Sequence, residues 1–79
     1  MKDNEKIKII QAVFRDVLSN KNIVISRNST PEDIEGWDSL VNINIVVALE
    51  EHFNIKFSLD EITNINSVED IVKMIESHL

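Results

Sequence analysis

The sequence predicts an all-α protein, a small four-helix bundle made of three main helices and a short third helix. Three segments place apolar residues at three- and four-residue spacing, which is the period of an amphipathic helix. The one run that resembles a strand, Ile23-Val24-Ile25, has no second run to pair with it. With 79 residues, 43% of them apolar, we expect a single domain spanning residues 1–79, which leaves little room for an enzyme.

The first helix is expected from about Asn4 to Ser19, with one apolar stripe made of Ile7, Ile10, Val13, Phe14, Val17 and Leu18. Residues 20–37 lose this period and contain scattered Asn, Ser, Thr, Pro and Gly, which predicts a long loop between helices one and two. Inside the loop, residues 30–33 combine a cap residue, a proline and two acids, which predicts a single helical turn. We expect Ile34 to pin that turn to the core.

Cap residues also mark the remaining helices. Asp38 begins a second helix that runs to about His52, with an inward stripe of Leu40, Ile43, Val46, Leu49 and Phe53. Ser58 and Glu61 match the capping box and predict the short third helix, in which Ile62 turns inward. Ser67 opens the last helix, whose expected inward residues are Val68, Ile71, Val72, Ile75 and Leu79.

Charge is distributed unevenly along the chain. Residues 1–28 carry six basic and three acidic side chains, whereas residues 29–79 carry two basic and eleven acidic ones. A surface this acidic repels the phosphate backbone of nucleic acids, which disfavours nucleic-acid binding. It would also steer a basic protein partner toward the C-terminal two-thirds of the chain. The longest apolar run, residues 45–49, is too short to span a membrane, and the N-terminus lacks an apolar signal segment. We therefore expect a cytoplasmic protein.

Most catalytic and metal-binding sites are disfavoured, because the residues that they need are either absent or too far apart in the sequence. His52 lies thirteen residues beyond Ser39 on the same helix, or about 20 Å at 1.5 Å per residue, which excludes a Ser-His pair within that element. His78 is expected to be solvated near the C-terminus. There is no cysteine, and the acidic clusters lack the glycine-centred calcium loop, so no metal site is expected. Gly36 stands alone and does not form a phosphate cradle.

The position of Ser39 is the remaining clue. If Asp38 caps the second helix, Ser39 is its first helical residue, with an exposed hydroxyl beside unpaired backbone N–H groups. Such a site favours a bound or attached phosphate, although the Asp38 carboxylate opposes it. An Asp-Ser helix start with no function beyond capping is the alternative.

The run E-D-I-E-G-W-D-S-L-V-N-I-N-I-V-V-A-L-E-E-H-F-N-I-K-F-S-L-D-E-I, residues 32–62, resembles the acyl carrier protein family. In that family Asp-Ser-Leu opens the second helix and Leu-Glu-Glu-x-Phe closes it. The resemblance extends more weakly over the rest of the chain. It implies a monomeric carrier in which Ser39 bears 4′-phosphopantetheine, transferred from coenzyme A by a separate magnesium-dependent phosphopantetheinyl transferase. The thiol of that arm would hold cargo as a thioester between biosynthetic enzymes.

The resemblance also implies a docking face on the second and third helices. Glu50 and Glu51 lie in a last turn, where the helix dipole disfavours carboxylates, so we assign them to docking on basic or mixed patches of acyl-loading and acyl-accepting enzymes. The full set of expected recognition residues is Asp38, Leu40, Val41, Asn44, Val47, Glu50, Glu51 and Ile62. Carriers of fatty acid synthesis usually place acids just after Asp-Ser-Leu, whereas this chain has Val41, Asn42 and Asn44. Val41 and Val47 also lie off the inward stripe. If they are exposed, they favour, together with Trp37, a carrier of a specialised pathway; deeper burial of this helix is the alternative.

Three alternatives stay open at this point. The chain could be an unmodified helical interaction module, which would dock without being pantetheinylated. It could be an aminoacyl or peptidyl carrier, although those usually show a glycine-rich sequence before the serine. A small hydrolase or transferase using Ser39 is the weakest alternative, because no base reaches that serine. For a carrier, we expect cargo to shelter between apolar side chains such as Ile43, Val46 and Ile62.

Overall fold

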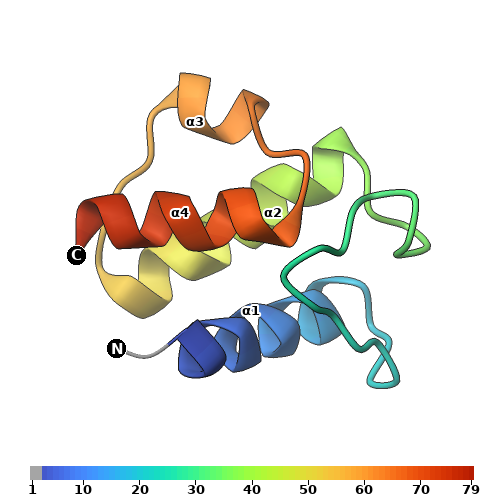
Figure 1. Cartoon of the computed structure of the whole chain (residues 1–79). Helices are drawn as coiled ribbons and strands as arrows, with labels where there is room; N and C mark the ends of the chain where they lie inside the picture. The colour runs from blue at the N-terminus through green and yellow to red at the C-terminus, as the bar shows by residue number, and fades with distance from the viewer. Residues whose placement is uncertain (1–2) are drawn as a thin grey trace.

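The computed structural model describes residues 3–79, and all its regular elements there are helices: α1 (Asp3–Val17), α2 (Ser39–Phe53), α3 (Leu59–Thr63) and α4 (Val68–His78). In Figure 1, α4 crosses in front of α2, α1 lies beneath them, and the short α3 sits at the opposite end of the molecule from α1. The long connection between α1 and α2 runs along one side. The predicted bundle, including its short third helix, is confirmed.

Helix α1 ends at Val17, two residues before the expected end at Ser19. Ser19 adopts a left-handed backbone with φ 52°, and a left-handed residue is a common way to end a helix. The inward stripe is centred on Ile10 and Phe14, both fully buried. Lys6 is also buried, and its Nζ lies 3.5 Å from a carboxylate oxygen of Glu76 in α4, so this ion pair joins the first and last helices.

The long loop packs onto the core without forming a strand. Ile23 and Ile25 are buried, whereas Val24 between them is 73% exposed. The predicted helical turn is a single hydrogen-bonded turn, in which the Asp33 amide donates to the Thr30 carbonyl at 2.9 Å. Ile34 is buried beneath it, as predicted.

Two backbone carbonyls of this loop accept hydrogen bonds from the first amides of α4. The Ser29 carbonyl accepts from the Val68 amide, and the Arg27 carbonyl accepts from the Glu69 amide, both at 2.9 Å. The first amides of a helix have no intrahelical partner, so these bonds satisfy donors that would otherwise need water. The loop is thereby fixed against α4.

The inward face of α2 differs from the prediction. Ile45, Val46 and Leu49 are buried, but Leu40 and Ile43, which we expected to point inward, are 68% and 49% exposed. Apolar residues surround this helix, as the run S-L-V-N-I-N-I-V-V-A-L shows. Three- and four-residue spacing therefore fits more than one face, and only packing against the other helices selects between them.

The capping predictions for α3 and α4 are confirmed. The Ser58 hydroxyl accepts from the Glu61 amide at 3.2 Å, and the Glu61 carboxylate accepts from the Ser58 amide at 2.8 Å. Ser67 caps α4 in the same position. The buried residues of α4 are Val68, Ile71, Val72, Met74 and Ile75. Leu79 was expected among them but is 64% exposed, because the helix ends one residue earlier, at His78.

Candidate functional site

The start of α2 presents Ser39 to solvent. Asp38 is the N-cap in extended backbone, and its Oδ1 accepts from the Val41 amide at 2.9 Å. Ser39 is the first helical residue and is exposed, as predicted. Within residues 3–79 its hydroxyl has no hydrogen-bond partner. The hydroxyl is therefore unpaired in the part of the chain that the structure describes, while the cap holds the backbone beneath it.

The turn before this serine is fixed on its inner side. Gly36 has φ +90°, a conformation that favours glycine, and a Cβ added there would lie 3.2 Å from Cδ2 of Leu18. Trp37 is 4% exposed, and its ring meets that of Phe14 edge-to-face at 4.8 Å between centroids. The Trp37 indole N–H donates to the Oδ1 atom of Asn42, one turn into α2. Trp37 is thus packed at the junction between the long loop and α2.

Asn42 is therefore a structural partner of the site, not simply a neutral residue on the docking face. Its amide oxygen is engaged by Trp37, and its side chain is half-buried. The sequence alone gave no signal for this contact, because a tryptophan and an asparagine five residues apart meet in many local geometries. The bond joins the turn that precedes Ser39 to the helix that follows it.

A groove of about 440 Å³ opens beside Ser39 between α2 and α3, lined by Pro31, Asp38, Ser39, Asn42, Ile43, Leu59, Ile62, Thr63, Ile65 and Asn66. Of the three residues expected to shelter cargo, Ile43 and the half-buried Ile62 line it. Val46 does not, because it is 1% exposed within the core. The groove places apolar and polar side chains next to the serine.

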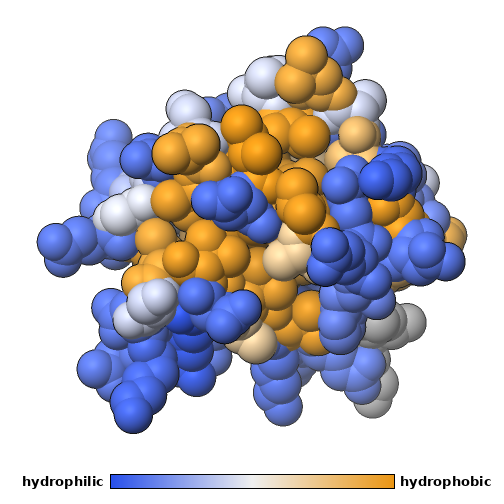
Figure 2. All heavy atoms as spheres, turned by 180° about the vertical axis from the view of Figure 1, so that it is seen from behind, coloured by the Kyte–Doolittle hydropathy of each residue, from blue (hydrophilic) through white to orange (hydrophobic). Residues whose placement is uncertain are grey.

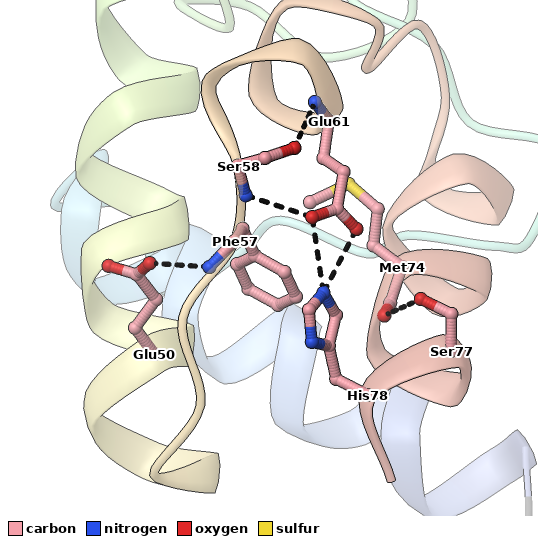
Figure 3. A network of polar contacts seen from close by, with 7 residues as sticks. All are labelled: Glu50, Phe57, Ser58, Glu61, Met74, Ser77 and His78. Atoms are coloured by element: carbon pink, nitrogen blue, oxygen red, sulfur yellow. Dashed lines mark hydrogen bonds and ion pairs between the residues drawn. The ribbon is translucent and has the colours of Figure 1, made fainter.

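One wall of this groove, α3, is held by polar contacts as well as by Ile62, which packs against the core. None of its residues is buried. The Glu61 carboxylate lies 3.0 and 3.1 Å from the Nε2 atom of His78 at the end of α4, as Figure 3 shows. The His78 ring also meets the Phe57 ring edge-to-face at 5.1 Å. His78 is exposed, as expected, but its imidazole also ties α3 to α4, a contact that the sequence did not indicate.

Glu61 is charged over a wider pH range than an ordinary glutamate. The backbone N–H of Ser58 and the contact with His78 hold its pKa below the usual value, and the Ser58 bond contributes most. The same carboxylate thus caps α3 and holds His78.

Glu50 has a structural contact that its place in the last turn of α2 did not reveal. Its Oε2 atom accepts from the Phe57 amide at 2.8 Å, across the connection to α3 (Figure 3). Phe57 is buried, so its amide depends on this acceptor. Glu51, in contrast, is exposed.

The other expected recognition residues divide by exposure. Leu40, Asn44 and Val47 are exposed on α2, whereas Val41 is half-buried and packs against the core. In Figure 2, which views the molecule from behind Figure 1, apolar side chains cover much of the face toward the viewer. Leu40 and Val47 are 68% and 47% exposed. The exposed side of α2 is thus largely apolar before its last turn.

Comparisons with known proteins relate this geometry to a family. The family model described as the phosphopantetheine attachment site matches residues 8–75. An acyl carrier protein of Wolinella succinogenes is 35% identical over 77 residues, covering 85% of this chain and 97% of that protein. One from Clostridium acetobutylicum is 36% identical over 74 residues, covering 94% and 92%.

A solved structure shows the same arrangement. The solution structure of a holo acyl carrier protein from Geobacter metallireducens has a TM-score of 0.79 and 34% sequence identity, covering 90% of this chain and 82% of that one. Within residues 3–79, no helix is long and apolar enough to cross a membrane. Proteins of this family carry acyl groups on 4′-phosphopantetheine and are not catalysts; they interact with phosphopantetheinyl transferases and acyl-handling enzymes. The chain belongs to the acyl carrier protein family.

Proposed function

We propose that Ser39 carries the 4′-phosphopantetheine arm and that the chain shuttles acyl or aminoacyl thioesters between enzymes in the cytoplasm, as a monomer. The observation that carries the assignment is the exposed, unpartnered hydroxyl of Ser39 at the first position of α2. Ser39 also lines the groove between α2 and α3. The residues match the family motif Asp-Ser-Leu, and the family model spans the position.

The surroundings of Ser39 suit a modified serine. Its oxygen would form a bond to a phosphorus of coenzyme A, the bond from that phosphorus to the nucleotide half would break, and the hydroxyl proton would pass to a base on the transferase. This chain supplies the position: Asp38 fixes the first turn through the Val41 amide. The attached phosphate would lie at a helix N-terminus, where the dipole favours negative charge by typically 0.3 to 1 kcal/mol.

Intact mass spectrometry tests the attachment. The protein is incubated with coenzyme A, magnesium and a broad-specificity phosphopantetheinyl transferase, and we expect a gain of one phosphopantetheine. Ser39→Ala should abolish the gain. Ser77→Ala, at an exposed position near the end of α4, is the control and should be modified normally. No gain in the wild type, or a gain that survives Ser39→Ala, would reject the assignment and favour an unmodified docking module.

We further propose that the partners are those of a specialised pathway, with an apolar docking surface and a basic group near the end of α2. The first turn of α2 contains no acid, and Leu40 and Val47 are exposed. Glu51 is an exposed carboxylate at the far end of the helix. Glu50 and Ile62 would contribute at the edge of the face, since each is only partly exposed. Docking would then depend on apolar contact along most of the helix and on charge at its end.

The salt dependence of docking tests this division. With a loading enzyme in hand, Glu51→Lys should weaken binding at low salt and lose its effect at high salt, because exposed charges are screened. Val47→Ser should weaken binding similarly at both salt concentrations. If Val47→Ser has no effect while Glu51→Lys has a large one, docking is chiefly electrostatic and the specialised assignment loses its support.

A further inference from the structure

The first turn of α2 has few contacts with the core. Ser39 and Leu40 are exposed, and Val41 and Asn42 are only half-buried. The first fully buried residue of the helix is Ile45, at the end of its second turn. Helix ends open more readily than helix centres, because their first amides lack intrahelical acceptors. The turn that bears the serine therefore depends on specific contacts to keep its orientation.

Two of these contacts are found at any capped helix. The Asp38 Oδ1 atom accepts from the Val41 amide, and the Asp38 carbonyl accepts from the Asn42 amide, both at 2.9 Å. They join residues that are neighbours along the chain, and they keep the turn helical. Both would move with the turn if it tilted away from the core, so they do not fix its direction.

A third contact ties the same turn to the core. The indole N–H of Trp37 donates to the Oδ1 atom of Asn42, and the Trp37 ring packs edge-to-face on Phe14 of α1. An indole N–H can only donate, and a ring that is 4% exposed has little access to water as a substitute acceptor. Asn42 thus connects the turn that holds Ser39 to α1 through one buried ring.

The chemistry proposed for Ser39 depends on orientation. Its oxygen forms a bond to a phosphorus of coenzyme A, the bond from that phosphorus to the nucleotide half breaks, and the hydroxyl proton passes to a base on the transferase. The attacking and leaving oxygens must lie roughly in line. The carrier supplies only the oxygen and its placement, and a displacement of about 1 Å can lower such a rate greatly. Whatever fixes the first turn of α2 therefore affects the rate.

We propose that Asn42 is a positioning residue for the loading of Ser39, an inference that rests on attachment at that serine. Through Trp37 it holds the first turn of α2 in the orientation that places the hydroxyl in line with the phosphorus. Val47 and Glu51 lie further along the helix, so a carrier with a loosened first turn still docks through them. Only a fraction of the docked complexes then reacts, and Asn42 acts on kcat and not on KM.

Steady-state loading kinetics test this role, with the carrier varied at saturating coenzyme A and magnesium. Asn42→Leu removes the acceptor, and Trp37→Phe removes the donor but keeps a ring against Phe14. Each should lower kcat at least about fivefold and change KM by less than about twofold. Because both changes break the same bond, the double variant should be no slower than the slower single variant. In amide exchange, both single variants should speed exchange at Val41 and leave Leu49 unchanged.

Ile75→Val is the control for a general loss of stability, because it removes one methylene from the core within α4. A partly unfolded carrier lowers the concentration of substrate and so raises the apparent KM, but kcat at saturation should stay at the wild-type value. An unchanged kcat in Asn42→Leu would overturn the proposal, as would a rise in KM alone or an equal fall in kcat for Ile75→Val.

Intact mass separates failure of the positioning role from failure of the attachment. If the wild type gains no phosphopantetheine, or if the gain survives Ser39→Ala, attachment at Ser39 is rejected and the positioning role is rejected with it. If the wild type is loaded at Ser39 and Asn42→Leu is loaded at the same rate, only the positioning role is rejected.

Discussion

Replacing Glu50 with alanine should destabilise the protein even though its carboxylate lies in the last turn of α2, where the helix dipole disfavours it. The carboxylate accepts from the Phe57 amide at 2.8 Å. Because Phe57 is 8% exposed, water replaces that acceptor poorly once the side chain is removed. The contact also fixes the connection between α2 and α3, so its loss should loosen α3 first.

The expected size follows from the cost of an unsatisfied buried donor. A lost partner of this kind costs about 1–3 kcal/mol, and the partial exposure of Glu50 favours the lower half of that range, about 1–2 kcal/mol. For a domain of 60–100 residues, each kcal/mol lowers Tm by roughly 4–8 °C. Glu50→Ala should therefore lower Tm by on the order of 5–15 °C.

Thermal unfolding followed by circular dichroism measures the effect, with two matched variants. Glu50→Gln keeps an acceptor oxygen without the charge and should retain most of the stability. Glu51→Ala removes an exposed neighbouring carboxylate and should change Tm by little. A Glu50→Ala protein as stable as the wild type would refute the reasoning, as would a Glu50→Gln protein destabilised as strongly as Glu50→Ala.

Three further outcomes are expected. Gly36→Ala should cost about 1–2 kcal/mol in chemical denaturation, because φ is +90° and the new Cβ meets Leu18 at 3.2 Å. Ile45→Ala should cost about 2–5 kcal/mol, whereas the same change at the exposed Ile43 should cost under about 1 kcal/mol. The lowered pKa of Glu61 contributes stability that is complete above its ordinary value of 4.5 and is lost as pH falls through the lowered pKa. Amide exchange in α3, corrected for its intrinsic pH dependence, should therefore show extra opening on acidification, which Glu61→Gln abolishes.

Local signals predicted the starts of the last three helices correctly. Asp38, Ser58 and Ser67 each accept from an amide three residues ahead, so the information lies within four residues of sequence. The placement of Ser39 as a first helical residue followed directly from the cap. The candidate site could therefore be located from the sequence alone, although its proposed chemistry depended on the resemblance to a family.

Contacts between distant residues could not be predicted in the same way. The side of α2 that faces inward depends on the other helices, so Ile45 was missed and Ile43 was misplaced. His78 reaches Glu61 across seventeen positions, and nothing near either residue indicates the other. Glu50 accepts from the amide of Phe57, which lies seven residues further along the chain and beyond the end of α2. The sequence around Glu50 therefore gave no sign of this contact.

The contacts of Trp37 have a practical consequence. It is the chain's only tryptophan and there is no tyrosine, so near-ultraviolet emission comes almost entirely from one indole. That indole touches Phe14 in the core and bonds to Asn42 two residues beyond Leu40. Intrinsic fluorescence therefore provides a label-free optical probe two residues from Ser39, and it offers a real-time readout for the proposed loading of that serine without modifying the protein.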